Sequence, residues 1–458
     1  MNAPTADESP RPRGRFRRGL RATLLALSIV GALTTLTLLI WSGPAIHRRL
    51  VVFPREEAAW NELRAQRQPV AEDAGWREFR GVLHAHSELS HDSEVPFPEI
   101  LQAMERARLD FIALSDHPLP DGRAGFDTQW RGLHGGRLFI PGFEMRDGLM
   151  PMGVRPGITL SNRLEPARLA RETAEHGGLL FFAHPENPRA WELPELNGME
   201  IYNLHTDFKR AGGSVTGALV RQIPDLVLSH RRFPDHLYRL PFQRPLDFLR
   251  RWDELNRTRK ITGIAGNDSH QNVGFRGFMT PEGTLRIEDT SPRVIRESRP
   301  GLLTRALLRL CFGPLEPGRR LFHVQFDPYE RSLRFVNTHV LARELTEAAV
   351  LDALRESRVF VAFDLLADSS GFRWLAESTT GRCVMGGTQT FTPDTRLRAL
   401  APVPGRFTLV KDGAVLARAE GRSAEWTAPG AGKYRVEVEL NIRGEWTPWI
   451  YANPLELR

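Results

Sequence analysis

Cysteine is nearly absent from this chain of 458 residues, which contains only Cys311 and Cys383. Two cysteines so far apart in sequence give neither a CxxC signature nor a disulfide framework. A single bridge between them stays open. Free buried thiols are the favoured interpretation, because cysteine is among the residue types most often buried.

Lysine is also scarce, and the net charge of +7 comes almost wholly from arginine at one end of the chain. Residues 1–49 hold eight Arg against Asp7 and Glu8, so the rest of the chain is close to neutral. A protein that grips the nucleic-acid backbone without regard to sequence needs a broad basic surface. We therefore expect no nucleic-acid partner, although this balance does not exclude a small local basic pocket.

Residues 22–46 contain no charged side chain. A helix of about 20 apolar residues spans the hydrocarbon core of a bilayer. Six Arg precede this segment and only Arg48 and Arg49 closely follow it, so the positive-inside rule keeps residues 1–21 in the cytoplasm as a basic tail. We predict a single-pass anchor in a bacterial cytoplasmic membrane with an extracytoplasmic, periplasmic body. The alternatives are a cleaved signal peptide, which also exports the body, and a buried helix of a soluble domain.

The rest of the chain divides into three parts by pattern. Residues 47–76 are polar and irregular, with one short helical stretch, and are predicted to be a tether. Over residues 77–385, short apolar runs alternate with helical stretches, which indicates an α/β domain with a parallel sheet and crossover helices. Residues 386–458 alternate apolar and polar positions around tight turns. This predicts a small all-β, immunoglobulin-like sandwich that gives support or contacts a partner.

Almost every predicted strand of the α/β part ends in a residue that can bind a metal. The stretch GVLHAHSELSHDS at 81–93 alone carries three histidines and an aspartate. The candidates at or just after strand ends are His84, His86, Asp92, Asp116, His117, Glu144, His184, Asp268 and His270. Because functional groups of α/β barrels gather at the C-terminal ends of the strands, we expect these side chains to converge on one metal site.

A single histidine at a strand end is more often a hydrogen-bonded structural residue than a ligand. We place six other histidines in that structural class: His134, His176, His230, His236, His323 and His339. An isolated HxH is also weak, because alternation puts both rings on one face of many strands. The ordered set of HxH, Asp, DH, E, HP and DxH, each after an apolar run, is specific. No Ser-His or Cys-His nucleophile pattern accompanies it.

The motifs HAHSELSHD, LSDH, PGFE, FAHP and GNDSH resemble, in order, those of the PHP (polymerase and histidinol phosphatase) superfamily of metallohydrolases. The resemblance covers about residues 78–365. EIYN at 200–203 and GNDSHQN at 266–272 resemble the carbaryl-hydrolase-like subgroup, as does ANPLEL at 452–457, beyond that range. The resemblance implies a distorted β7α7, TIM-like barrel that holds two or three divalent metal ions.

The resemblance also implies how the ligands are shared among the metals. His84 and His86 would bind one metal together with Asp268. Glu144 would bridge that metal to a second one, which His184 also holds.

A third metal would be held by Asp92, His117 and His270, with Asp92 preferred over His91 for its spacing. We assign catalytic roles to two carboxylates. Asp268 acts as a ligand, and Asp116 stands behind the ligands and orients a ring or a backbone turn.

One position departs from the family pattern. Many relatives carry a histidine several residues after the bridging glutamate, where this chain has Leu149 and Met150. The second metal is therefore expected to be weak, absent, or completed by His205 or Asp147.

Mixed imidazole and carboxylate ligands suit Zn²⁺, Mn²⁺ or Fe²⁺ better than Mg²⁺ or Ca²⁺. We predict a hydrolase that uses metal-activated water on a small molecule or an envelope polymer. The superfamily resemblance favours a phosphoester, and the subgroup resemblance favours a carboxylester, carbamate or amide. The alternative is a catalytically degenerate binding protein of the cell envelope, in which a metal is only structural.

Overall fold

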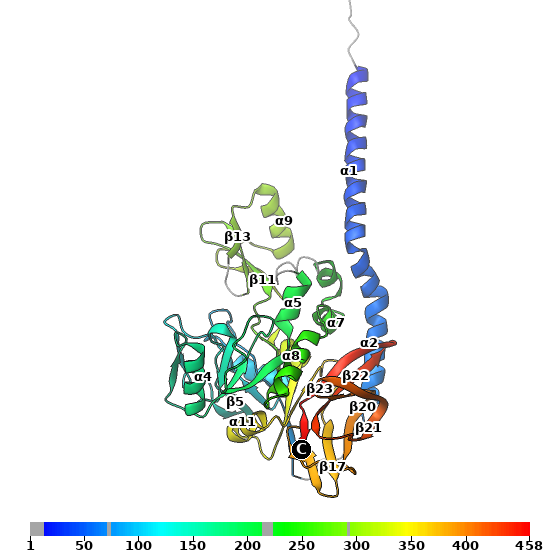
Figure 1. Ribbon diagram of the computed structural model, residues 1–458. Helices are drawn as coiled ribbons and strands as arrows, with labels where there is room; N and C mark the ends of the chain where they lie inside the picture. The colour runs from blue at the N-terminus through cyan, green and yellow to red at the C-terminus, as the bar shows by residue number, and fades with distance from the viewer. Residues whose placement is uncertain (1–12, 71–74, 213–222, 291–293) are drawn as a thin grey trace, which may run out of the picture.

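The computed structural model describes residues 13–70, 75–212, 223–290 and 294–458. A long N-terminal helix stands out from a body of mixed helices and sheets (Figure 1). The chain begins with α1 (Arg13–His47), continues through a π-helical turn (Arg48–Val52), and enters α2 (Phe53–Ala65).

The helix α1 is long and apolar enough to cross a membrane. The most apolar window of the Thr23–Ala65 helical stretch has a mean hydropathy of 2.2, and none of that window is buried against the body. A signal sequence near an N-terminus has the same properties, so the helix fits both export readings of residues 22–46.

The segment expected to be a tether, residues 47–76, contains α2, which packs onto the body. Trp60 is only 1% exposed. Arg64 donates hydrogen bonds to the main-chain oxygens of Leu365 and Leu366, at 2.7 and 3.1 Å. This part of the chain is therefore held by residues about 300 positions away.

The α/β body is built from short buried strands and amphipathic helices. Its central parallel strands are β1 (Arg77–Val82), β2 (Phe111–Ala113), β5 (Arg137–Ile140), β8 (Leu179–Phe182), β9 (Leu196–Asn203) and β10 (Thr262–Gly266). The covering helices are α3 (Phe97–Ala107), α4 (Pro166–Glu175), α5 (Leu204–Gly212), α7 (Pro234–Arg239), α8 (Leu246–Asn256), α10 (Tyr329–Phe335) and α11 (Glu347–Arg355). In α3 the buried positions Ile100, Ala103, Met104 and Ala107 recur every three or four residues, as on one face of a helix.

Shorter elements complete this part. They are β3 (Arg123–Gly125), β4 (Gly132–His134), a 3₁₀ turn (Arg146–Gly148), β6 (Leu149–Met152), β7 (Thr159–Ser161), β15 (Asn337–Ala342) and β16 (Val359–Ala362).

The strands do not close into the TIM-like barrel expected from the sequence. β1, β2 and β5 lie in the largest sheet, whereas β10, β9, β8 and β6 form a separate sheet in that order. Only isolated bridges link the two sheets, Ala85 with Ser269 and Gly142 with Met152. The mixed α/β class with parallel central strands is confirmed, and the closed barrel is not.

A small lobe is inserted after the last predicted ligand motif. It comprises β11 (Gly274–Met279), β12 (Leu285–Asp289), β13 (Val294–Ser298), α9 (Leu302–Phe312) and β14 (Arg320–Gln325). The four strands form an antiparallel sheet in the order β13-β12-β11-β14. Cys311 lies exposed on α9, and Cys383 is half-buried. Both thiols are free, as predicted, but the expectation of burial is wrong for Cys311.

The C-terminal strands pair mostly antiparallel. They are β17 (Arg373–Ser378), β18 (Gly381–Val384), β19 (Thr388–Gln389), β20 (Arg396–Lys411), β21 (Ala414–Thr427), β22 (Gly432–Ile442), β23 (Glu445–Ala452) and β24 (Leu455–Leu457). One pair, β19 with β24, is parallel. β17 pairs with β20 across the predicted boundary at residue 385, and β23 pairs with β16 of the α/β body. The C-terminal strands therefore continue the large sheet, and the predicted immunoglobulin-like sandwich stays a prediction.

Candidate metal centre

The predicted ligands follow the C-terminal ends of the parallel strands. His84 and His86 come after β1, and Asp268 and His270 come after β10. The amide of His86 donates to the main-chain oxygen of Ser269 at 2.9 Å, which fixes the two loops side by side. Strand ends that lie in different sheets are thus brought to one point.

Four side chains form a first group, which we call cluster A: His84, Glu144, His184 and Asp268. Their candidate ligand atoms all lie within 4.8 Å of one another. His84 Nε2 is 3.1 Å from Asp268 Oδ1 and 3.3 Å from Glu144 Oε2. His184 Nε2 is 3.3 Å from the other oxygen of Glu144.

Four further side chains form cluster B: His86, Asp92, His117 and His270. Asp92 Oδ2 lies 3.2 Å from His270 Nε2 and 3.4 Å from His117 Nε2. His86 was expected to share a metal with His84 and Asp268. Its Nε2 lies 3.2 Å from that of His84 and 3.3 Å from Asp268 Oδ1, so the two clusters adjoin and the sharing stays a prediction.

The sequence spacing preferred Asp92 over His91 as a ligand, and the structure places these two side chains differently. Asp92 enters cluster B, whereas His91 stays exposed and its ring stacks at a tilt on that of His117, with centroids 4.8 Å apart.

The atoms of these clusters face a common centre and do not face one another as hydrogen-bonded pairs do. Asp268 Oδ1 is buried and has no well-aligned hydrogen bond, although ring nitrogens of His84 and His86 lie 3.1 and 3.3 Å away. Ligands about 2.0–2.2 Å from one metal stand roughly 3–3.5 Å from each other. The observed separations therefore fit atoms that share a divalent cation.

Burial and mutual charge shift the pKa values of these groups. Burial opposes charge on His84, but Asp268, Glu200 and Glu144 outweigh it and raise the pKa of His84 well above its usual value. Burial would raise the pKa of Asp268, yet the surrounding imidazoles hold it well below its ordinary range. For His86, burial and the charge of His270 lower the pKa to about 3. The centre thus concentrates carboxylate charge that only ring protons or cations can offset.

Glu200 was not assigned a role from the sequence, and it supports the two histidines of cluster A from behind. Its Oε1 lies 2.5 Å from His84 Nδ1, and its Oε2 accepts from the amide of His184 at 2.8 Å. A carboxylate on the far nitrogen of a ligating histidine fixes the tautomer and aims the other nitrogen at the metal. A β-carbon added at Gly266 would lie 2.0 Å from Glu200 Oε1, so only glycine fits there. The signal was a glutamate in the middle of the apolar run GMEIYN.

Asp116 does not enter either cluster. Its carboxylate accepts from the amide and hydroxyl of Ser87, at 2.5 and 2.8 Å, and from the side chain of Gln129 at 2.7 Å. These contacts hold the turn that follows the HxH motif, which is the orienting role expected for Asp116.

The position of the missing histidine is taken by buried apolar side chains. Leu149 and Met150 lie fully buried in β6. Of the two substitutes considered, His205 approaches cluster A, with Nδ1 3.3 Å from Asp268 Oδ2. Asp147 is exposed and pairs with Arg146 at 3.1 Å. His205 is therefore the group that can complete the ligand set.

Two ligands sit in strained backbone. His184 has φ of 50° and Asp268 has φ of 52°, in the left-handed region that residues other than glycine rarely adopt. Such strain persists where surrounding contacts impose it, and it is concentrated at functional sites. The other histidines that we set aside as structural lie outside both clusters.

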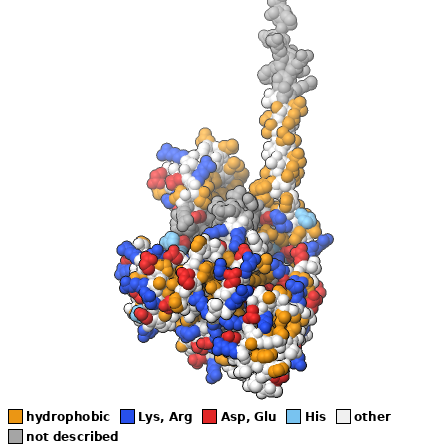
Figure 2. All heavy atoms as spheres, in the orientation of Figure 1, with side chains coloured by type: hydrophobic (Ala, Val, Ile, Leu, Met, Phe, Trp, Pro, Cys, Tyr) orange, Lys and Arg blue, Asp and Glu red, His pale blue; other side chains and the backbone are white. Residues whose placement is uncertain are grey.

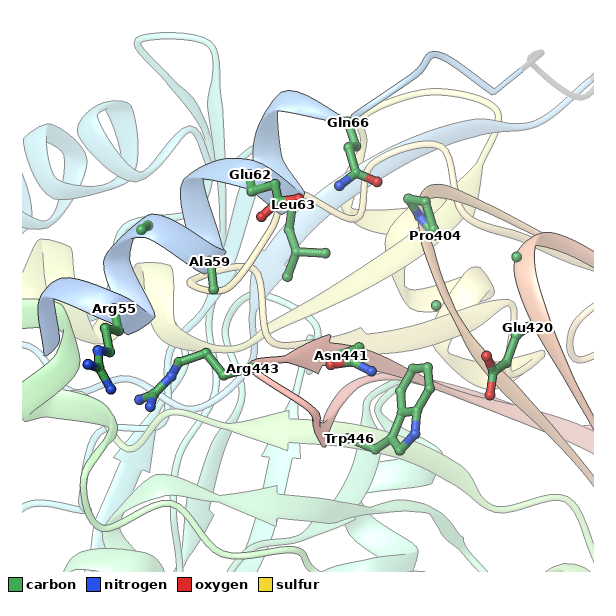
Figure 3. A pocket seen from close by; sticks show the side chains of 13 residues that line it. Arg55, Ala59, Glu62, Leu63, Gln66, Pro404, Glu420, Asn441, Arg443 and Trp446 are labelled. Atoms are coloured by element: carbon green, nitrogen blue, oxygen red, sulfur yellow. The ribbon is translucent and has the colours of Figure 1, made fainter. Parts of the chain in front are cut away.

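A cavity lies elsewhere in the molecule. It measures about 640 Å³ and opens between α2 and the C-terminal strands, with Arg55, Glu62, Asn441, Arg443 and Trp446 in its wall (Figure 3). None of the eight residues of clusters A and B lines it.

Comparisons with known proteins add little. No protein-family model matches the sequence, and no curated protein matches it. Among the solved structures that match is a two-domain protein from Bacteroides vulgatus ATCC 8482, described as containing a predicted PHP-like metal-dependent phosphoesterase. The two chains are 14% identical over 84% of this chain and 98% of the other, with a TM-score of 0.36. A score this low carries no argument about function.

Proposed function

We propose that this chain is a metal-dependent hydrolase of the PHP type that cleaves phosphoesters, with its body held at a membrane by α1. The observation that carries the proposal is the geometry of clusters A and B, whose ring nitrogens and carboxylate oxygens face shared centres. Buried charges are otherwise paired with opposite charges or with hydrogen-bond donors. The PHP-type motif order in the sequence supports the reaction class.

The protein's own groups prepare the site for metals and substrate. Bound divalent ions would supply the positive charge that lowers the pKa of water and polarises the bond to be broken. Glu200 holds the ring of His84 by Nδ1 and leaves Nε2 facing the centre. The most exposed rings are those of His117 and His205, whose side chains are 27% and 30% exposed, so substrate reaches the centre past them.

The proposal that the body lies outside the cytoplasm rests on the sequence around α1. The charge difference across residues 22–46 favours a body outside the cytoplasm. An uncleaved anchor is favoured because the apolar run exceeds the usual core of a signal peptide. A reporter fused to the C-terminus should be active only in the exported compartment. Activity in the cytoplasm would overturn this topology, and a mature N-terminus near residue 46 would replace the anchor by a signal peptide.

The decisive experiment combines metal analysis with a substrate panel. The full chain is stripped with a chelator, reloaded with Mn²⁺ or Zn²⁺, and assayed on phosphomonoesters, phosphodiesters and carboxylesters. We expect hydrolysis of a phosphoester that appears only after reloading. Asp268→Asn, purified in parallel, controls for contaminating phosphatases.

The other results separate the competing functions. Turnover of carboxylesters alone would move the substrate to the carbonyl class. Stoichiometric metal without hydrolysis of any ester would favour the binding-protein alternative. Absence of bound transition metal would remove the proposal altogether.

A further inference from the structure

The helix α9 exposes a continuous apolar face. Leu302, Leu303, Leu307 and Leu310 are 90, 76, 52 and 83% exposed. Residues 303, 307 and 310 are spaced three or four apart and so share one side of the helix, with Ala306 between them. No residue of α9 is buried. Contiguous exposed apolar surface of this kind marks a site of contact with a membrane or another protein.

The charges around this face are basic. The lobe from 274 to 325 holds nine Arg against five Asp and Glu, although the body as a whole is nearly neutral. Arg305 and Arg309 lie four residues apart in α9, on the side of the helix away from residues 303, 307 and 310. A helix with leucines on one face and arginines on the polar face is typical of segments that lie in the interface of a bilayer.

The position of the lobe also fits contact with a membrane. α9 projects from the same side of the body as α1 and reaches the height of its C-terminal half (Figure 1). That half belongs to the stretch apolar enough to cross a membrane. In the space-filling view, hydrophobic and arginine side chains occur together at the outer end of the lobe (Figure 2).

We propose that α9 is a second membrane contact, with its leucines inserted among the lipids and its arginines at anionic headgroups. The inference rests on α1 spanning the membrane but not on any hydrolytic activity. An anchored chain keeps the lobe at the bilayer permanently, so even a short interfacial helix remains bound. Two contact points would fix the orientation of the body, which one helix alone leaves free to rotate.

The experiment uses the native thiol of Cys311, which is exposed on α9. The full chain carrying Cys383→Ala is placed in vesicles of phosphatidylcholine and phosphatidylglycerol, at less than one chain per vesicle. Cys311 is labelled with an environment-sensitive fluorophore, and quenching by spin-labelled lipid is compared with quenching by aqueous iodide. The control places the only cysteine at Thr380, in the turn after β17, at the end of the body away from α1 and α9 (Figure 1).

We expect lipid quenching and iodide protection at Cys311, and the reverse at position 380. Leu303→Asp with Leu310→Asp should reduce lipid quenching at Cys311 to the control level, and these exposed side chains contribute little to the core. Vesicles of phosphatidylcholine alone, or added salt, should weaken the contact by removing its electrostatic part.

Three outcomes would overturn the inference. Equal iodide access at Cys311 and at position 380, in chains that remain in the vesicles, means that α9 stays in water. Protection that appears only when several chains share a vesicle assigns the face to a second copy of the chain. Extraction of the chain from vesicles by alkaline carbonate means that α1 is no anchor, which removes the premise independently of α9.

Discussion

Two buried groups of histidine and carboxylate side chains lie in the α/β body, and different side chains balance the charge of their carboxylates. The group around His339 joins Glu78, Asp364, Arg80 and Arg373. His339 lies between the two acids, with its nitrogens 2.9 Å from Glu78 and 2.7 Å from Asp364. Arg373 and Arg80 contact the same two carboxylates, at 2.7 and 3.2 Å.

The candidate metal centre contains comparable acids and rings, but in the part of the chain that the structure describes its acids form ion pairs with histidines and with no arginine or lysine. Its carboxylates face imidazoles, and His84 and His86 face each other at 3.2 Å through the same kind of nitrogen. In the His339 group arginine balances the acids, whereas imidazoles alone face the acids of clusters A and B, and we propose that a cation completes the charge there.

The largest effect should come from the His339 group. Asp364→Asn keeps the shape but leaves the protonated His339 and Arg80 without their charge partner. Breaking a buried pair by removing one member costs roughly 3–5 kcal/mol of unfolding free energy. Urea unfolding would measure the loss, with turnover per folded molecule unchanged. A loss below about 1 kcal/mol would mean that the acid is not needed to balance charge there.

Asp268→Asn should lower turnover strongly and the unfolding free energy only a little, which is the reverse of Asp364→Asn. The amide keeps the volume of the carboxylate but no longer supplies charge to a metal, so turnover should fall more than a hundredfold, or ~3 kcal/mol of transition-state stabilisation. The unfolding midpoint should move much less than in Asp364→Asn. Steady-state kinetics on the reloaded enzyme provides the test, and near wild-type turnover would remove Asp268 from the ligand set.

Chelation should distinguish the two groups without mutation. A metal at a hundred times its Kd stabilises the folded state by about 2.7 kcal/mol. The melting temperature should therefore fall on chelation and recover with Mn²⁺ or Zn²⁺. Asp364→Asn should retain this metal-dependent shift, whereas Asp268→Asn should lose most of it. A shift of equal size in both variants would place the metal elsewhere.

The pH dependence of stability should identify the His339 group. Burial opposes charge on His339, but Asp364 and Glu78 raise its pKa from 6.5 to about 9. The folded state therefore holds a proton that the unfolded chain releases near pH 6.5. The resulting stabilisation is full below that pH and falls by about 2 kcal/mol between pH 7 and pH 9. Urea unfolding of the metal-bound wild type and of His339→Asn across this pH range isolates the contribution of the His339 proton to stability. Parallel pH curves for the two proteins would contradict it.

The smallest effect is expected at His91. Its exposed ring only stacks on that of His117, with centroids 4.8 Å apart, whereas Asp92 supplies an oxygen to cluster B. His91→Ala should leave turnover and metal content within about twofold of wild type, since exposed side chains contribute little. Asp92→Asn should lower the metal content. The reverse order would exchange the two assignments.

The convergence of the candidate ligands could be predicted from the sequence because each depends on one local pattern. An apolar run followed by a histidine or an acid places that side chain at or just after a strand end, as for His184 and Glu144. How the candidate ligands divide between two centres depends on loop conformations such as the left-handed backbone at Asp268. No residue pattern encodes that division.

Features that depend on distant parts of the chain were missed. Glu200 is a supporting group only because β9 lies between β8 and β10, which brings it behind His84 and His184. Closure of a barrel depends on whether strand ends pair fully or through single bridges, and here only single bridges form. The contact of Arg64 with residues 365 and 366 could not be read from the neighbourhood of Arg64.

That contact bears on how far the candidate metal centre can move from a membrane. A flexible linker of about 30 residues would let a tethered domain move about 30 Å from its anchor. Because α2 follows α1 after one π-helical turn and is bonded to the body, a spanning α1 would hold the body rigidly. Under the proposed function, the centre would then stay at one height above the bilayer. Its accessible substrates would be those that diffuse through this thin layer, whatever their concentration in the wider compartment.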